Sequence, residues 1–196
     1  MTRQDERRAA TIAAIRASAR KLFAAAGFEN TSIDEIASHA GVTKGAFYHH
    51  FDSKERIFED VLEMAQSELS ARVVRAAAKS ETPMMAIELG MRQFLTDSAK
   101  RDFRQIIFID GPAVLGWKRW REVDLRHFGG MVRQSIQAIR GSSELDGRDD
   151  ALVHLLLGAF TEAALICGAA KNPAASARDL AEGVQVLLTG LKTSRS

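Results

Sequence analysis

Residues 31–51, TSIDEIASHAGVTKGAFYHHF, contain two helix starts separated by a glycine turn, and this segment constrains the fold more than any other. Ser32 followed three positions later by Glu35 forms a capping box, in which each side chain bonds the other residue's backbone at a helix start. Gly41 can adopt the left-handed conformation that ends this helix, and Thr43 can cap the next one. The segment therefore predicts two short helices packed at a steep angle, a helix-turn-helix.

The second of these helices, expected from Lys44 to about His50, has two different faces. Phe47 and Phe51 lie one turn apart, so both can pack against the core. The opposite face then carries Lys44, Gly45, Tyr48 and His49. A lysine, a closely approachable glycine backbone and two hydrogen-bond donors suit the phosphates and base edges of a DNA groove. From spacing alone, the alternative is a helical hairpin in an ordinary bundle, whose polar face lies in water.

Helical patterns also fill the rest of the chain. Apolar residues at 3.6-residue spacing predict one helix over 7–26, ended by Gly27, and another from Lys54 to about Lys79. Further helices are expected over 84–98, 102–109, 117–140, 149–170 and 175–191, with a break over 110–117 at Gly111–Pro112 and a loop over 141–148. The sequence therefore predicts an all-α fold of about nine helices, in which a helical bundle follows an N-terminal three-helix domain.

The composition excludes several classes of protein. A hydrophobic content of 46% with 27% charged residues is typical of a globular chain rather than a disordered one. Cys167 is the only cysteine, which excludes an internal disulfide and a multi-cysteine zinc site. The start, MTRQDERRAA, lacks the apolar core of a secretory signal, and no run approaches the roughly 18 apolar residues of a membrane span. We therefore expect a cytoplasmic protein without a membrane partner.

No motif for a metal, a cofactor or catalysis stands out. His49 and His50 are adjacent on a helix and point about 100° apart, so they cannot readily chelate one ion. Gly111, Gly116 and Lys118 only superficially resemble a phosphate loop, because no serine or threonine follows the lysine. We expect no metal, no cofactor and no enzymatic activity. The alternative class is a small helical enzyme or carrier with an apolar cavity, which predicts no salt-dependent binding to duplex DNA.

The chain beyond Pro83 is rich in large, adaptable side chains that can line a ligand cavity, although most of them are expected to be core. The candidate pocket residues are Met91, Phe94, Phe108, Trp117, Trp120, Phe128, Met131, Phe160 and Glu162. Glu162 follows His154 by eight residues on an otherwise apolar helix, so the two can orient a ligand or pair across a subunit interface. This composition favours a largely apolar or aromatic small molecule.

The last two expected helices carry apolar and small residues on more than one face. A monomer would expose these faces to water, whereas two copies can bury them in a four-helix bundle. The candidate interface residues are Leu155, Ala159, Ala163, Val184, Leu187 and Leu191. The sequence therefore predicts a homodimer.

Residues 12–58 resemble the DNA-binding domain of the tetracycline-repressor (TetR) family of bacterial transcription factors. The resemblance rests on Phe23, Gly27 and Phe28 at the end of the first helix, and on the runs TSIDEIA, AGV, GAFYHHF and SKERI that follow. It implies a helix-turn-helix DNA-binding domain over 1–56 and a ligand-binding and dimerisation domain over 57–196. It also implies a repressor that leaves a palindromic operator when a small-molecule effector binds. A ligand-independent or activating regulator is the alternative within this class.

The resemblance further assigns roles to individual residues. Thr31 and Ser32 would contact phosphate at the start of the second helix, and Lys54 would do so from the start of the fourth. Thr43 would join Lys44, Gly45, Tyr48 and His49 in the recognition helix. For His50 two positions stay open, one partly buried beside Phe51 and one turned to the phosphate backbone.

Overall fold

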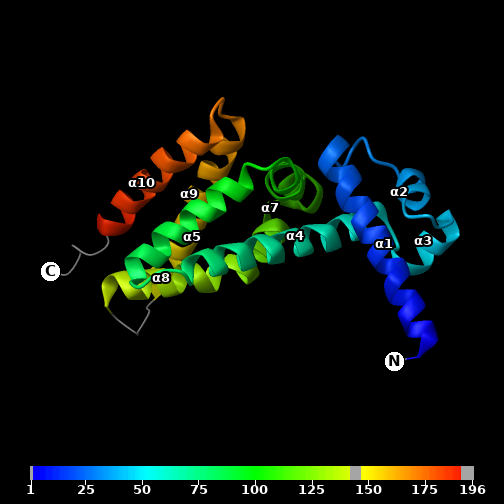
Figure 1. Ribbon diagram of the computed structural model, residues 1–196, viewed down its shortest axis with the longest axis horizontal. Coiled ribbons are helices and arrows are strands. Elements are labelled where there is room, and N and C mark those ends of the chain that lie inside the picture. Colours follow the sequence, from blue (N-terminus) through cyan, green and yellow to red (C-terminus); the bar gives the residue numbers. More distant parts are fainter. Residues whose placement is uncertain (1, 142–146, 191–196) are drawn as a thin grey trace. The chain divides into compact units, whose positions relative to one another are not determined.

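The computed structural model describes residues 2–141 and 147–190 (Figure 1). Within these ranges every regular element is helical, so the all-α prediction is confirmed. The elements are α1 (Arg3–Ala26), α2 (Ile33–His39), α3 (Lys44–His50), α4 (Lys54–Ala77), α5 (Pro83–Ser98), α6 (Arg101–Phe103), the π-helix η1 (Arg104–Asp110), α7 (Gly111–Asp124), the π-helix η2 (Leu125–Gly129), α8 (Gly130–Arg140), α9 (Gly147–Ala169) and α10 (Pro173–Gly190).

The chain divides into two compact units. The first unit contains the N-terminal segment up to Ala65 together with Arg101–Trp120, and the second contains Gln66–Lys100 together with the described residues from Arg121 onward. Segment 101–120 thus packs with the first helices. The predicted division into domains over 1–56 and 57–196 stays a prediction.

The short helices of the first unit begin and end where the capping residues lie. Ser32 Oγ accepts a hydrogen bond from the Glu35 N–H at 3.2 Å, and the Glu35 carboxylate accepts one from the Ser32 N–H at 2.7 Å. Thr43 Oγ1 accepts from the Ala46 N–H at 3.1 Å and starts α3. Gly41 has φ +69°, the left-handed conformation that the turn between the two helices requires. The helix-turn-helix prediction is confirmed in its element bounds.

An aromatic cluster forms the centre of the first unit. The rings of Phe23, Phe28 and Phe58 lie 5.2–5.8 Å apart, and the two pairs that involve Phe58 are edge-to-face. Phe47 of α3 and Ile36 of α2 are also completely buried. Because α1 packs on α2 and α2 on α3, the three helices are held by one apolar core.

Segment 101–110 is tied to α1 by polar contacts. Arg101 donates a hydrogen bond to the carbonyl of Ala25, and Arg20 forms a 3.0 Å ion pair with Asp102. The buried Asp110 carboxylate accepts a hydrogen bond from the Phe28 N–H at 2.8 Å. It also accepts one from Gln105 Nε2 at 2.9 Å. These contacts explain why a segment some 80 residues further along the chain belongs to the first unit.

The break predicted over 110–117 is present but does not lie at Gly111–Pro112, where the chain stays helical from η1 into α7. The interruption lies at Gly116, which has φ +74° and ψ 155°. Pro112 has no N–H, so it cannot donate to the carbonyl of Ile107 five residues earlier, as a residue in a π-helix would. The Trp120 indole N–H donates to this carbonyl instead, at 2.8 Å. Gly111 allows this approach, since a Cβ atom there would lie 2.7 Å from Trp120 Cδ1.

The second unit is a helical bundle in which α5 packs on α8, α9 and α10 (Figure 1). One segment, Asp150–Ala169 of α9, is long and apolar enough to cross a membrane by length and composition, with a mean hydropathy of 1.8. The sequence-based expectation that no run approaches such a span was therefore too strict. In the structure one side of α9 packs against α5, α8 and α10, while other apolar side chains of this helix, such as Leu155 and Ile166, are exposed.

Candidate nucleic-acid interface and ligand cavity

The outer face of α3 gathers four of the predicted DNA-contact residues. Lys44, Gly45, Tyr48 and His49 are all exposed, whereas Phe47 and Phe51 are buried. Tyr48 is 46% exposed, and its ring lies edge-to-face at 5.6 Å from the Phe47 ring. The phenylalanines fix the helix from one side, so that the donors on the other side have defined positions.

The Lys44 ammonium pairs with a carboxylate of α2. Its Nζ lies 3.0 Å from Asp34, and the hydrogen bond and charge of Asp34 raise the pKa of Lys44. Both side chains are exposed, and such a surface pair contributes little to stability. Lys44 can therefore exchange Asp34 for a phosphate or a base edge at little cost.

The hydroxyl residues at the starts of α2 and α3 differ in whether they are accessible for a phosphate contact. Ser32 and Thr43 are exposed and serve as the N-caps described above. Thr31, in contrast, is only 2% exposed, and its hydroxyl donates to the carbonyl of Gly27 at 2.8 Å. The phosphate contact predicted for Thr31 does not fit this position, because its hydroxyl proton is already used inside the protein.

Lys54 is tied to the connection between α1 and α2. Its ammonium donates to the carbonyl of Phe28 at 2.9 Å and to that of Thr31 at 3.0 Å, and it lies 4.1 Å from the centre of the Phe28 ring. The side chain thereby joins the start of α4 to the connecting loop. Its phosphate contact stays a prediction, and its printed contacts support a structural role.

His50 occupies the partly buried position rather than an exposed one. Its Nδ1 is buried without a hydrogen-bond partner, and its ring centre lies 5.1 Å from that of His49. Burial lowers the pKa of His50, and the positive charges of His49 and Arg8 lower it further. These surroundings disfavour the charged form of His50.

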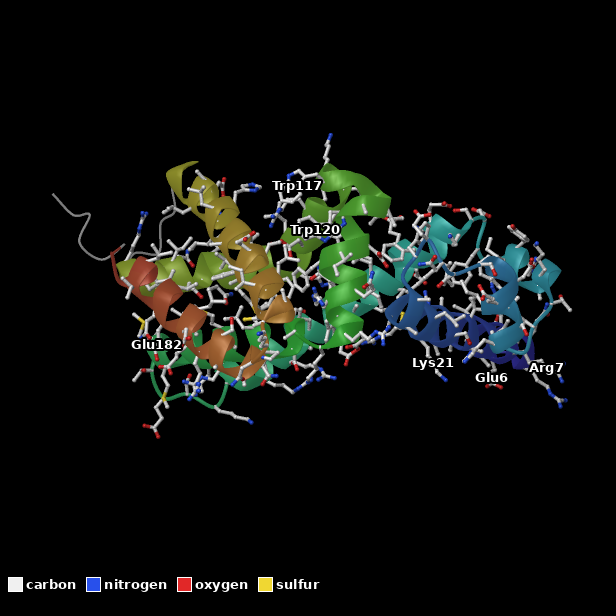
Figure 2. The ribbon with its side chains drawn as sticks, turned by 90° about the horizontal axis from the view of Figure 1, so that it is seen from above. Glu6, Arg7, Lys21, Trp117, Trp120 and Glu182 are labelled. Atoms are coloured by element: carbon white, nitrogen blue, oxygen red, sulfur yellow. The ribbon has the colours of Figure 1, made fainter. Side chains whose placement is uncertain are left out.

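The sequence analysis missed the arginines at the start of α1. The effect of Arg8 on His50 places Arg8 near the end of α3, and Arg3, Arg7 and Arg8 are all exposed. Figure 2 shows Arg7 extending outward from this end of the first unit. The signal in the sequence was the pair Arg7–Arg8 immediately before the first apolar residues.

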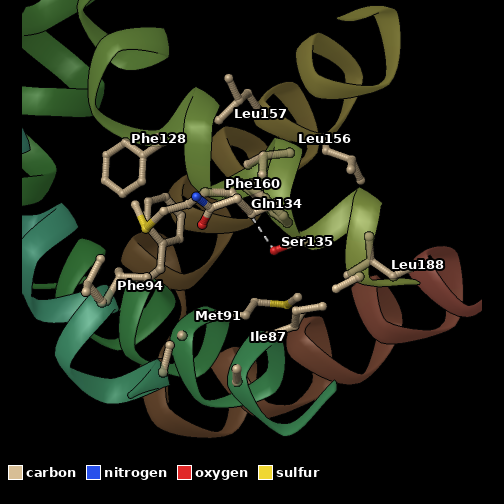
Figure 3. A pocket seen from close by; sticks show the side chains of 18 of the residues that line it. Ile87, Met91, Phe94, Phe128, Gln134, Ser135, Leu156, Leu157, Phe160 and Leu188 are labelled. Atoms are coloured by element: carbon tan, nitrogen blue, oxygen red, sulfur yellow. Dashed lines mark hydrogen bonds between the residues drawn. The ribbon is translucent and has the colours of Figure 1, made fainter. Parts of the chain in front are cut away.

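The second unit contains a cavity of about 430 Å³ (Figure 3). Five of the nine candidate pocket residues line it, namely Met91, Phe94, Phe128, Met131 and Phe160. The ring of Phe94 lies 5.5 Å from that of Phe128 and 6.2 Å from that of Phe160. Aliphatic side chains from α4, α5, α8, α9 and α10 complete the wall, including Val73, Ile87, Val132, Leu156, Leu157 and Leu188. The cavity is therefore formed within one unit.

The other four candidates do not line this cavity. Phe108, Trp117 and Trp120 belong to the first unit. Trp120 is completely buried against Gly111, and the 61% exposed Trp117 lies beside it with ring centres 5.0 Å apart (Figure 2). Glu162 is exposed on α9. Helical spacing placed the three aromatic residues near apolar faces, but it did not indicate which unit each face belongs to.

The cavity wall also contains a carboxylate that the sequence analysis missed. Asp124 is 5% exposed, and its Oδ2 accepts a hydrogen bond from Arg121 Nη1 at 2.6 Å. Burial raises the pKa of Asp124 to about 6, although Arg121, Gln66 and His127 act to lower it. The sequence signal was an aspartate four residues after Trp120, on the apolar face of its helix.

The predicted dimer residues fall into three groups. Leu155 and Leu187 are 69% and 60% exposed, and Ala159 is half-buried. Ala163 and Val184 face the interior of their own bundle, so they cannot form an outer contact surface. Leu191 lies outside the described residues. Ile166 and Val186, which were not predicted, are also exposed large apolar side chains on α9 and α10.

Two family models match the chain. Residues 15–61 match the bacterial regulatory proteins of the tetR family, and residues 84–191 match the tetracyclin repressor-like C-terminal domain. Among curated proteins, the transposon Tn10 TetC protein of Escherichia coli is 28% identical over 163 residues, which cover 83% of this chain and 82% of TetC. The transcriptional regulator AcrR of Shigella flexneri is 32% identical over 96 residues, or 45% of this chain and 43% of AcrR.

Solved structures show the same fold over the whole chain. A TetR-family transcriptional regulator from Pectobacterium atrosepticum has a TM-score of 0.77 and 26% identity, with complete coverage of both chains. The regulator RolR, solved with resorcinol, has a TM-score of 0.69 and 19% identity over 97% of each chain, a likeness of fold alone. The C-terminal model spans more than half of the chain and the helix-turn-helix model precedes it, so this protein belongs to the tetR family of bacterial regulatory proteins and is a DNA-binding transcriptional regulator.

Proposed function

We propose that the protein is a homodimeric cytoplasmic repressor that holds a palindromic operator through α3 and releases it when a small effector fills the cavity of the second unit. The observation that carries the DNA-binding part is the division of α3 into two faces. Phe47 and Phe51 are buried, and the four donor residues are exposed together. A helix fixed in this way suits entry into a major groove.

The contacts with DNA divide into two kinds. Lys44, Tyr48 and His49 lie where a recognition helix reads base edges and phosphates. Ser32 and Thr43, at the starts of α2 and α3, suit phosphate contacts that set the register. Two copies would place two such helices in successive major grooves about 34 Å apart, which explains the expected palindrome.

The exposed apolar residues of α9 and α10 support the homodimer. Leu155, Ile166, Val186 and Leu187 are large apolar side chains in contact with water in the single chain. Pairing of this surface with a second copy would remove it from water. The half-buried Ala159 allows close approach on α9.

Release by a small molecule is supported by the cavity and by relatives. A volume of about 430 Å³ with mostly apolar walls is typical of a ligand site. IcaR of Staphylococcus aureus, 28% identical over 86 residues and 46% of its length, is a negative transcriptional regulator, and the RolR structure contains resorcinol. We propose no enzymatic role, because Asp124 is the one charged side chain among the described residues that line the cavity, and it is paired with Arg121.

Fluorescence anisotropy with a duplex that carries the palindrome upstream of the protein's own gene tests this proposal. Lys44→Ala and Tyr48→Phe should each weaken specific binding by about 1–3 kcal/mol. The exposed Lys171, in the second unit, supplies the matched control Lys171→Ala, which removes the same charge and should leave affinity unchanged. Equal affinity of wild type and both α3 variants at several salt concentrations would refute the assignment of α3.

A further inference from the structure

We propose that the effector is an uncharged, largely apolar molecule whose hydroxyl group donates a hydrogen bond to the carboxylate of Asp124. This inference rests on the proposed function, which makes the cavity of the second unit an effector site. It adds the chemical class of the effector and the residue that selects it.

The cavity offers a ligand very few polar groups. Four polar residues line it, Asp124, Gln134, Ser135 and Thr161. Ser135 Oγ already donates to the Met131 carbonyl at 3.0 Å, and Thr161 Oγ1 donates to the Leu157 carbonyl at 2.8 Å. Figure 3 shows Ser135 among apolar side chains, with Phe94, Phe128 and Phe160 nearby. A ligand therefore meets apolar surface almost everywhere, and Asp124 is the strong acceptor among these four groups.

The charge of Asp124 decides which ligands are accepted. Its partner Arg121 is buried but does not line the cavity, so the carboxylate is the charged group that a ligand meets. An anionic ligand would lose its hydration and be repelled there. A cationic ligand would bring a second positive charge to a carboxylate that already has one, inside apolar walls. A neutral donor avoids both penalties and gains a charge-assisted hydrogen bond.

Gln66 is a second buried polar side chain beside Asp124. Its side chain is completely buried. Its amide atoms lie outside ordinary hydrogen-bond geometry, yet the side chain acts as a hydrogen-bond donor to the Asp124 carboxyl and lowers the pKa of that group. Buried polar groups without partners are uncommon in proteins. Gln66 does not line the cavity, so of this pair only the carboxylate meets the ligand, and a hydroxyl supplies the O–H donor that this acceptor can use.

The position of this polar cluster in the chain connects it to regulation. Arg121 and Asp124 lie on the last turn of α7, directly after Trp120, the residue with which the first unit ends. Gln66 directly follows Ala65, where the same unit ends on α4. Both helices continue from the cluster into the unit that contains α3. A ligand held at Asp124 therefore acts on the two helices that lead to the DNA-binding surface, whereas the apolar walls mainly supply affinity.

Three probes with one ring system test the proposal by isothermal titration calorimetry: 2-naphthol, 2-methoxynaphthalene and 2-naphthoate. The first donates a hydrogen bond, the second cannot, and the third is an anion. Wild-type protein should bind 2-naphthol at least about tenfold more tightly than the ether, as expected for a hydrogen bond to a charged group. It should bind 2-naphthoate most weakly. This comparison needs no variant.

Asp124→Asn should reduce the preference for 2-naphthol over the ether to less than about threefold and improve binding of 2-naphthoate. The matched control is Asp150→Asn, which removes an exposed α9 carboxylate that pairs with Arg133 and does not line the cavity. It should keep the wild-type ratios. Equal binding of 2-naphthol and the ether by wild type, tightest binding of 2-naphthoate, or no binding of any probe would each overturn the proposal.

Operator binding by the same preparation separates this inference from the proposed function. If the protein binds its operator but does not discriminate among the probes, the assignment of Asp124 fails while the regulatory function stands. If it discriminates among the probes but binds no operator, the proposed function fails while Asp124 remains the selective group of a ligand site.

Discussion

Replacement of Lys54 by methionine should destabilise the protein, because the ammonium holds three groups at once. The change removes hydrogen bonds to the carbonyls of Phe28 and Thr31 and the contact with the Phe28 ring. Hydrogen bonds that involve a charged group contribute about 1.5–3 kcal/mol each, and an exposed cation–π contact about 0.5–1 kcal/mol. Because the side chain is only half-buried and water can replace part of these contacts, we expect a net loss of about 2–4 kcal/mol.

Urea denaturation followed by circular dichroism measures this loss, and at about 2–4 °C per kcal/mol the melting temperature should fall by roughly 4–16 °C. Lys44→Met is the matched control. Lys44 has one exposed partner, Asp34, so its replacement should leave stability nearly unchanged. Unchanged stability of Lys54→Met, together with a salt dependence of DNA binding that is flatter by about one unit, would refute the structural role and restore the phosphate contact.

Three further outcomes follow from buried or exposed positions. The native pKa of Asp124, raised to about 6 from 3.8, means that the folded protein binds more protons than the unfolded chain between these values. The free energy of unfolding should therefore fall by about 3 kcal/mol through Asp124 as pH rises through this window. Urea titrations at pH 4 to 7 should show a smaller fall for Asp124→Asn than for wild type, and an equal pH dependence of the two proteins would contradict the raised pKa. Gly111→Ala should destabilise the fold by about 1–3 kcal/mol, because its Cβ would clash with Trp120, and the emission of that buried indole should change; an unaltered spectrum and stability would show that the packing relaxes freely. Leu187→Arg should yield a folded monomer in analytical ultracentrifugation, whereas Ala163→Arg should destabilise the chain itself because Ala163 is buried; a persistent Leu187→Arg dimer would place the interface elsewhere.

The parts of the structure that depend on neighbouring residues were predictable from the sequence. The capping box at Ser32 and the cap at Thr43 act within three residues, and the bounds of α2 and α3 agree with them. The burial of Phe47 and Phe51 follows from their spacing of one helical turn. The exposed face of α3, and with it most of the candidate DNA site, was therefore accessible before the structure.

Contacts between distant residues were not predictable in the same way. Lys54 donates to carbonyls 23 and 26 residues earlier, and the Asp110 carboxylate accepts from the Phe28 N–H across 82 residues. No local pattern encodes such partners. The break predicted over 110–117 lies at Gly116 rather than at Gly111–Pro112 for a related reason, since the indole of Trp120 supplies a donor where the proline has none.

The cavity shows the same limit for apolar residues. Phe94 and Trp120 both lie on apolar helical faces, yet one lines the cavity and the other is buried against Gly111 in the first unit. Helical periodicity identifies a buried face, but it does not tell which neighbour covers that face. Asp124 was missed because its spacing from Arg121 allows an ion pair at three residues' distance, but does not show that the pair is buried or that the carboxylate lines a cavity.

The chain passes between its two compact units three times, after Ala65, after Lys100 and after Trp120. A chimaera that exchanges only an N-terminal cassette with a relative would therefore combine one protein's α1 with another protein's segment 101–120. The Arg20–Asp102 ion pair and the hydrogen bond between the Phe28 N–H and Asp110 would then depend on residues from two parents. Exchange of DNA specificity among such regulators should succeed when segment 101–120 is exchanged together with the N-terminal helices. It should also succeed when only the exposed residues of α3 are replaced.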